Sequence, residues 1–197
     1  MTRNADADRP YHHGDLRAAL LGEAERTLRD RGIDALSLRD LARQADVSHA
    51  APRRHFADRQ ALLDALAEAG FTRLADEVRA AIDDAGQDYQ ARLRAAATAY
   101  VRFATRDRAL LDLMFGAKND ESPGARYGTP ERLFTIVGDL VRQGQQAGQL
   151  PPGDPEPLRL LLVATLQGVA MLITSGLVGA SQIEPLIADA VAVFARV

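Results

Sequence analysis

One stretch of sequence decides the fold of the N-terminal part of the chain. It reads Leu36-Ser-Leu-Arg-Asp-Leu-Ala-Arg-Gln-Ala-Asp-Val-Ser48 and continues as His49-Ala-Ala-Pro-Arg-Arg-His-Phe56. Ser37 and Asp40 form a capping box in which Asp replaces the usual Glu, so a short helix is expected to begin there. Asp46 follows at a corner that needs positive φ and usually carries Gly, a conformation that Asp tolerates. Ser48 can cap a second short helix from His49 to about Phe56. The pattern predicts two short helices joined by a sharp turn.

The apolar residues of the stretch fit the register of a helix-turn-helix. Ala42 is the small residue at which the second helix approaches the first, and the interior positions are then Leu38, Leu41, Val47 and Phe56. Pro52 falls near the first turn of the second helix, where its missing N–H costs little if the helix starts one residue later. We therefore expect a helix-turn-helix over residues 37–56.

The residues left exposed by this register have the chemistry of DNA recognition. The second helix of such a unit lies in the major groove, and here it presents His49, Ala50, Arg53 and Arg54. Arginine binds guanine through two hydrogen bonds or neutralises a phosphate, and an alanine methyl contacts thymine. Arg59 begins the next helix, where backbone N–H groups also suit phosphate. The stretch thus predicts contact with double-stranded DNA.

Composition and charge agree with a soluble protein whose basic residues gather at one end. The 197 residues are 47% hydrophobic and 26% charged, which is enough apolar material for one or two packed domains. The first sixty residues hold eleven arginines against ten acidic residues, together with all four histidines, whereas the remainder holds thirteen basic and seventeen acidic residues. Cysteine is absent, so disulfides and thiolate metal sites are excluded. The polar N-terminus lacks the apolar core of a signal peptide, and we expect a cytoplasmic protein.

The rest of the chain is also expected to be helical. Ala, Leu, Arg, Glu and Gln are abundant and alternating β-branched runs are absent, which predicts an all-α fold of about nine helices. Thr129-Pro-Glu131 and Asp154-Pro-Glu156 each supply a cap, a proline and an acid, so they mark helix starts. Besides this pair and the two short helices, helices are expected over residues 15–31, 59–85, 89–106, 110–115 and 185–197.

From residue 11 to 66 the sequence resembles the DNA-binding region of the tetracycline-repressor (TetR) family. The resemblance is carried by the stretch quoted first, by Tyr11-His-His-Gly-Asp-Leu16 and by Ala57-Asp-Arg-Gln-Ala-Leu-Leu63. It implies that the DNA-facing residues are Ser37, Arg39, Ser48, His49, Ala50, Arg53, Arg54, His55 and Arg59. Arg53 departs from the family pattern, because members usually carry there a Tyr that contacts phosphate. Two roles are open for His55: it either packs against neighbouring side chains or contacts a phosphate.

The resemblance also implies a domain order. We expect a flexible arm over residues 1–10, a helix-turn-helix DNA-binding domain over 11–57 and a helical ligand-binding and dimerisation domain over 58–197. Each subunit of a homodimer then presents one short reading helix, and the two heads reach a palindromic operator about one turn apart.

Pairing of the last two helices with their copies in a second subunit is implied in the same way. The expected interface residues are Gly168, Gly176, Ala180, Leu186, Ile187, Ala190, Val191 and Phe194. The uncharged run from Leu160 to Ala180 is long enough to span a membrane. It has neither an aromatic belt nor a basic flank, so a helix buried in a bundle is favoured and no membrane partner is expected.

The resemblance to the TetR family also implies a ligand cavity inside the C-terminal bundle. Candidate lining residues are Tyr100, Phe103, Leu110, Met114, Phe115, Phe134, Val137, Val141, Leu166, Gln167 and Met171, although each taken singly is more often a core residue. Val163 and Gln167 stand where one subgroup carries Trp and His, so no effector of that subgroup is transferred. The family's habit is repression, with release of DNA when a small, partly apolar effector binds.

Other classes of protein fit less well. The sequence has no H-E-x-x-H, G-x-G-x-x-G, P-loop or G-x-S-x-G motif, so no enzyme and no catalytic residue is predicted. His12, His13 and Asp15 could indicate a metal, but adjacent histidines do not share a helix face, and we expect neither metal nor cofactor. The alternatives that stay open are an unrelated bundle with solvated arginines and an interaction protein of the same fold that has lost specific DNA binding.

Overall fold

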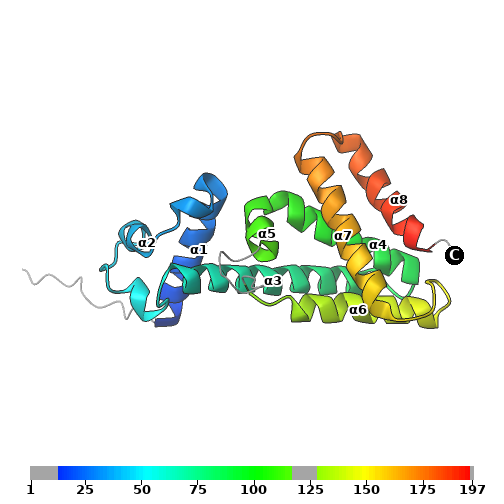
Figure 1. Ribbon diagram of the computed structural model, residues 1–197, viewed down its shortest axis with the longest axis horizontal. Coiled ribbons are helices and arrows are strands. Elements are labelled where there is room, and N and C mark those ends of the chain that lie inside the picture. Colours follow the sequence, from blue (N-terminus) through cyan, green and yellow to red (C-terminus); the bar gives the residue numbers. More distant parts are fainter. Residues whose placement is uncertain (1–12, 117–127, 196–197) are drawn as a thin grey trace, which may run out of the picture. The chain divides into compact units, whose positions relative to one another are not determined.

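The computed structural model describes residues 13–116 and 128–195, and within these ranges the fold is all-α, as predicted (Figure 1). The elements are α1 (His13–Arg31), η1 (Ile33–Ala35), α2 (Leu38–Gln44), η2 (Pro52–Arg54), α3 (Arg59–Asp84), α4 (Tyr89–Arg106), α5 (Arg108–Phe115), α6 (Glu131–Gln146), α7 (Pro155–Thr174), η3 (Ala180–Gln182) and α8 (Ile183–Ala195), where η denotes a 3₁₀ helix. Eight of the nine expected helices are α-helices in the described ranges. The ninth, at residues 49–56, is replaced by the 3₁₀ helix η2. The expected arm, 1–10, lies outside the described residues.

The chain divides into two compact units, Met1–Leu66 and Ala67–Val197. The division falls inside α3, so this one helix supplies buried side chains to both units: Leu62 and Leu63 to the first, Phe71 and Leu74 to the second. A helix can do this because its apolar residues recur every three or four positions along its whole length. The expected domain boundary at residues 57 and 58 stays a prediction.

The N-terminal unit has a small apolar core. Leu20, Ala24 and Leu28 form the buried face of α1, at the spacing of one helix face. Phe56 is buried as well, and the guanidinium of Arg17 lies 5.5 Å from the centre of its ring, a cation–π contact.

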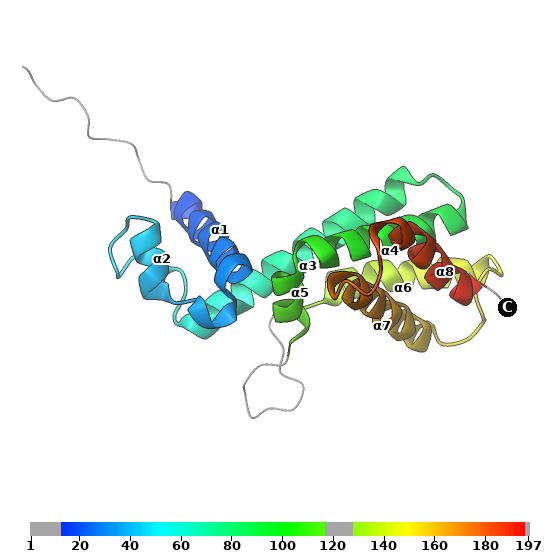
Figure 2. The ribbon, with the colours of Figure 1, turned by 90° about the horizontal axis from the view of Figure 1, so that it is seen from above.

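The C-terminal unit is centred on α4 and α7. Leu93, Ala97, Tyr100 and Ala104 form the predicted buried face of α4. Helix α7 packs against α4, α6 and α8, and both views of the ribbon place α7 beside α8 (Figures 1 and 2). The core of this unit is therefore contributed by the C-terminal part of α3 together with α4, α6 and α7.

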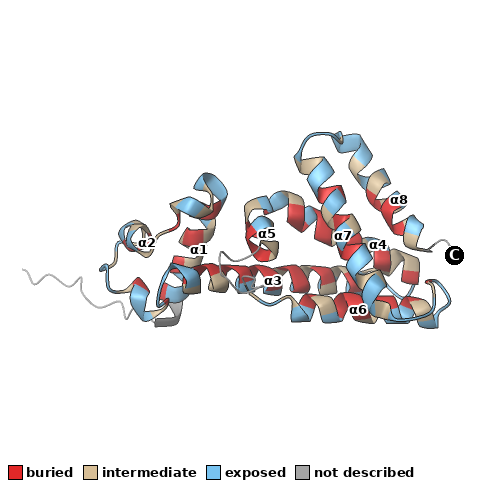
Figure 3. Ribbon diagram, viewed as in Figure 1, coloured by how far each residue is buried: buried red, intermediate tan, exposed pale blue. Residues whose placement is uncertain are grey.

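The outer face of α7 is apolar and exposed (Figure 3). It is the one described helix with the length and composition to cross a membrane, yet only 28% of its most apolar window is buried. Leu161 is 56% exposed and Met171 is 69% exposed. The expectation of a helix buried all round is therefore wrong for this chain on its own, because neighbouring helices cover only one face of α7.

Helix ends are set by side-chain caps at several sites. The Asp88 carboxylate accepts from the Ala91 N–H (2.7 Å), and Asp154 caps α7 by accepting from the Glu156 N–H (3.1 Å). Thr129 does not cap α6 as its sequence context predicted. Its N–H and its hydroxyl both donate to Glu68 Oε2 (3.0 Å each), so it joins the start of α6 to α3.

A charged cluster fixes the corner between α4 and α5. Asp107 is buried there and pairs with Arg73 (3.2 Å) and with Arg106 Nε (2.7 Å). Arg106 also pairs with Glu77 of α3 (2.8 Å), and this bond, followed by that to Asp107, raises the pKa of Arg106. The guanidinium groups of Arg73 and Arg106 lie 5.3 and 5.4 Å from the ring of Phe103. Charge pairing and cation–π contacts together hold this corner against α3.

We expect Gly144→Ala to lower the free energy of unfolding by about 2 kcal/mol, because an added methyl group overpacks the core. A Cβ at this position would collide with the Tyr89 hydroxyl and lie 2.8 Å from Leu150 Cγ. Gly22→Ala is the matched control, since Gly22 lies in α1 with nothing within 4 Å of such an atom. There the same change should stabilise the protein by about 0.5–1 kcal/mol through helix propensity. Urea unfolding of both variants checks this, and similar shifts in both would contradict the close contact.

Candidate nucleic-acid interface and ligand groove

The turn after α2 has the backbone geometry predicted for it. Asp46 has φ 52° and is the one non-glycine residue with positive φ in the described chain. Its N–H donates to the Arg43 carbonyl (3.4 Å), and the Val47 N–H donates to the Ala42 carbonyl (3.0 Å). This pair of bonds is a Schellman motif, whose left-handed position is usually glycine. The corner turns the chain sharply toward Ser48.

Ser37 caps α2 as predicted, but Asp40 completes the expected capping box differently, because its carboxylate accepts from the Ser37 hydroxyl and not from the Ser37 N–H. The Ser37 hydroxyl oxygen accepts from the Asp40 N–H (3.1 Å), and its O–H donates to Asp40 Oδ2 (2.7 Å). This hydrogen bond, assisted by Arg43, holds the pKa of the Asp40 carboxyl below its usual value. Ser37 is thus already engaged within its own helix start.

The segment after the corner is not the regular helix that the sequence predicted. The Ala51 N–H donates to the Ser48 carbonyl (2.9 Å), and the Arg54 N–H donates to the Ala51 carbonyl (3.2 Å), which is 3₁₀ bonding. The cause is Pro52, which has no N–H to give to Ser48 four residues earlier. The segment winds as a turn and one short 3₁₀ helix, η2.

The predicted DNA-facing residues gather in a short part of the N-terminal unit, between the end of η1 and the start of α3. Those that are exposed are Arg39, Ser48, His49, Ala50, Arg53, Arg54 and Arg59, whereas Ser37 and His55 are half-buried. The His55 ring packs at 6.5 Å, centre to centre, from that of Phe56. Its role as packing residue or phosphate contact stays open.

Arg59 has a structural function that the sequence did not indicate. Its Nε donates to the Leu36 carbonyl (3.0 Å), and its Nη2 donates to the Ile33 carbonyl (2.6 Å). These bonds tie the start of α3 to the turn before α2. Contact of Arg59 with phosphate stays a prediction, and removal of its side chain would also disturb the fold.

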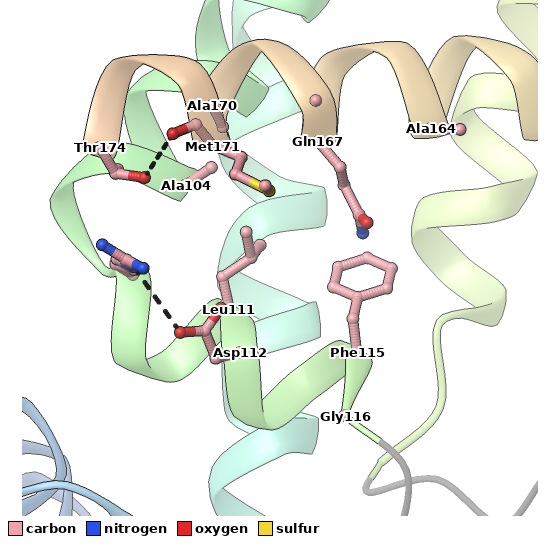
Figure 4. A pocket seen from close by; sticks show the side chains of 12 residues that line it. Ala104, Leu111, Asp112, Phe115, Gly116, Ala164, Gln167, Ala170, Met171 and Thr174 are labelled. Carbon is pink, nitrogen blue, oxygen red and sulfur yellow. Dashed lines mark hydrogen bonds and ion pairs between the residues drawn. The ribbon is translucent and has the colours of Figure 1, made fainter. Parts of the chain in front are cut away.

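A groove of about 510 Å³ lies in the C-terminal unit between α5 and α7, and Ala104 of α4 also lines it (Figure 4). Phe115, Gln167 and Met171 are the predicted ligand residues that line it. The other lining residues were not predicted as ligand residues from the sequence; they are Ala104, Arg108, Leu111, Asp112, Gly116, Ala164, Gly168, Ala170 and Thr174. The only signal for them was the spacing of Arg108 and Asp112, which allows an ion pair along one helix face.

The other predicted ligand residues do not line this groove. Tyr100, Val137 and Leu166 line a small apolar void of about 20 Å³ in the bundle. Phe103, Leu110, Met114 and Val141 are buried core residues and line neither space. Phe134 is half-buried under the Arg159 guanidinium, 4.4 Å from its ring centre.

The predicted interface residues divide into two groups. Gly168, Gly176 and Ala180 are exposed and Leu186 and Phe194 are half-buried. Ile187, Ala190 and Val191 are buried within the chain's own bundle, so they do not form a free surface. The exposed apolar side chains that the sequence analysis did not select are Leu160, Leu161, Leu172, Leu177 and Val193.

The metal site that His12, His13 and Asp15 could form, which was not expected from the sequence, lies largely outside the described part of the chain. His12 lies outside the described residues, and so do the side chains of His13 and Asp15. Among the side chains that are described, no three of His, Asp or Glu are grouped so as to hold a metal ion.

Comparison with known families identifies the class of protein that this architecture represents. Residues 20–66 match the family described as bacterial regulatory proteins, tetR family. Residues 93–194, just over half of the chain, match the family described as tetracyclin repressor-like, C-terminal domain. The chain belongs to the TetR family of transcriptional regulators.

Solved structures agree with this assignment. A protein with unknown function from Rhodococcus sp. RHA1 is 43% identical, with a TM-score of 0.83 over 95% of this chain and 97% of that chain. The TetR family transcriptional regulator PfmR from Thermus thermophilus is 19% identical, with a TM-score of 0.66 over 90% of this chain and 97% of that chain. The fatty acid degradation regulator FadR from Bacillus halodurans is 13% identical, with a TM-score of 0.68 over 94% of this chain and 97% of that chain. The last two similarities concern the fold alone. No curated protein matches the sequence.

We expect Asp46→Ala to lower the free energy of unfolding by about 1 kcal/mol. The left-handed conformation is strained for alanine, whose methyl group makes no local hydrogen bond to offset the strain. Asp46→Gly should cost less stability, since glycine adopts this conformation without strain. Its only cost is the larger conformational entropy that the unfolded chain loses on folding. Urea unfolding followed by circular dichroism compares the two variants. If both lose the same stability, the left-handed corner does not limit this unit.

Proposed function

We propose that this TetR family regulator binds a palindromic DNA operator as a homodimer and represses transcription until a small, partly apolar effector releases it. The observation that carries the DNA-binding part is the exposed arginine pair, Arg53 and Arg54, in η2, the first helical element after the Asp46 corner. Guanidinium groups on an exposed element of a helix-turn-helix suit guanine edges and phosphates. Because η2 is a 3₁₀ helix, its side chains point in directions different from those of a regular reading helix.

Self-association is supported by the apolar outer face of α7. Leu160, Leu161 and Leu172 are exposed there, and Gly168 among them leaves room for the close approach of a second helix. Exposed large apolar side chains clustered on one helix mark a partner surface in a soluble protein. A two-fold dimer through α7 and the end of α8 would present two DNA-binding units to a two-fold symmetric operator.

Effector response is supported by the groove between α5 and α7, whose volume lies in the range of small-molecule sites. A ligand that binds one arrangement of the C-terminal unit better than another shifts the population toward it. If the two arrangements place the DNA-binding units at different spacings, the same ligand changes the affinity for DNA.

DNA binding is tested with genomic fragments enriched on the immobilised protein. We expect Arg54→Ala to weaken binding to the selected fragment by about tenfold or more, the loss expected for one two-pronged contact with guanine. Binding to unrelated duplex of equal length should fall much less. Arg94→Ala is the matched control, because Arg94 is an exposed arginine on α4 in the other unit.

Gel shifts at fixed salt concentration measure the dissociation constants for the selected fragment and for the unrelated duplex. Equal losses on both DNAs for Arg54→Ala would show that Arg54 contacts only phosphate. If no genomic fragment is enriched at all, the alternative of a TetR-fold interaction protein without specific DNA binding replaces the proposal.

For the dimer, we expect Leu161→Glu to convert the protein into a monomer at micromolar concentration, because it buries a charge in an apolar interface. Leu161 is exposed and lies outside the groove, so the chain itself should still fold. Ala80→Glu, on an exposed position of α3, is the matched control and should remain dimeric. Light scattering distinguishes the two masses. A Leu161→Glu variant that remains dimeric would place the interface elsewhere.

A further inference from the structure

Ion pairing divides the exposed arginines of the N-terminal unit into two kinds. Arg26 of α1 pairs with Glu23, and Arg43 of α2 pairs with Asp40 (3.2 Å). An arginine beside a carboxylate adds little net charge to its surroundings, because the two charges oppose each other. Arg17 is exposed on α1, and among the side chains that the structure describes no carboxylate pairs with it. Its positive charge is therefore not compensated locally.

The Arg17 side chain reaches the end of η2, although the residue belongs to α1. Its guanidinium carbon lies 5.5 Å from the centre of the Phe56 ring, and Phe56 is only 2% exposed. The Phe56 N–H donates to the Pro52 carbonyl (2.9 Å), so Phe56 closes the turn that η2 begins. The exposed residues of that turn are Arg53 and Arg54. The fold thus brings a charge from the first helix to the short element whose arginines are predicted to face DNA.

The ring of Phe56 holds the Arg17 guanidinium without neutralising it. A cation is attracted by the face of an aromatic ring, but this contact supplies no oxygen acceptor for the N–H donors of the guanidinium. The contact also restricts a long side chain, so less conformational entropy is lost when the guanidinium binds an anion. An exposed guanidinium held in this way suits a phosphate oxygen, which accepts charge-assisted hydrogen bonds.

We propose that Arg17 binds a backbone phosphate of double-stranded DNA, next to the part of the duplex that η2 contacts. Arg17 is not one of the DNA-facing residues that the sequence pattern and the family resemblance indicate. A phosphate contact carries no sequence information, but it fixes the register and orientation of the element that reads the bases. This inference rests on the DNA binding proposed above and adds α1 to the elements that contact the duplex.

Arg17→Met tests the contact, because it removes the charge and keeps an unbranched side chain beside the Phe56 ring. Fluorescence anisotropy of the full chain measures the affinity for the selected fragment and for unrelated duplex at several salt concentrations. For a homodimer with one such contact per subunit, we expect the slope of log affinity against log salt concentration to become shallower by about 1.8. At about 0.1 M salt, both affinities should fall by about tenfold or more.

Two further variants separate the phosphate contact from general effects of charge and packing. Arg26→Met is the matched control, because Arg26 is exposed on the same helix and its removal changes the net charge equally. Its slope should equal that of the wild type. Arg17→Lys keeps a cation within reach of the phosphate and should restore most of the slope. Circular dichroism checks that all three variants are folded under the assay conditions.

The possible results are distinct. An unchanged slope for Arg17→Met, while the wild type binds the selected fragment, refutes this inference alone and leaves Arg17 as a packing residue. Equal shifts for Arg17→Met and Arg26→Met would show that only the net charge matters, and a loss confined to the selected fragment would assign Arg17 to a base. Failure of Arg17→Lys to recover any affinity would also overturn the phosphate contact. If the wild type binds no DNA, the proposed function fails independently of every Arg17 variant.

Discussion

Both compact units depend on one constraint, the unbroken apolar ridge of α3. Leu62 and Leu63 are buried in the N-terminal unit, and Phe71, Leu74 and Val78 are buried in the C-terminal unit. A single helix can contribute to two cores only if its apolar period is kept across the division, which leaves no place for a proline. The one glycine in α3, Gly70, occurs where Met114 approaches, since an added Cβ would lie 2.6 Å from its sulfur.

The sequence predicted features that depend on local chemistry. The Ser37 cap, the left-handed Asp46 and the buried face of α4 follow from residues within a few positions of one another, and all three occur. The prediction of a regular second helix was wrong, although Ser48 is a favourable cap residue, because Pro52 interrupts the helical hydrogen bonding. The lost hydrogen bond to Ser48 outweighed this preference, and the segment took 3₁₀ bonding instead. Local rules thus failed at Pro52, where two of them competed, and at Thr129, whose hydroxyl donates to Glu68 of α3 and does not cap α6.

Features that depend on distant neighbours were harder to predict. An apolar stripe on α8 indicates that Ile187 and Val191 are covered, but not by what, and the chain's own bundle covers them. The groove combines residues of α4, α5 and α7, and the spacing of Arg108 from Asp112 indicates an ion pair but not that the pair lines a groove. Arg59 likewise carried the sequence features of a phosphate ligand, whereas in the fold its guanidinium holds two backbone carbonyls. Propensity and spacing do not encode such tertiary partners.

Ala164, Gly168 and Met171 line the groove and also lie exposed on the outer face of α7. Under the proposed function, a mutation at any of these three residues would alter both the site for the effector and the surface offered to a second copy of the chain. Leu111 and Phe115, on α5, line the groove from the opposite wall. Under the same proposal, substitutions on the α5 wall would change the fit of the effector while leaving the outer face of α7 intact.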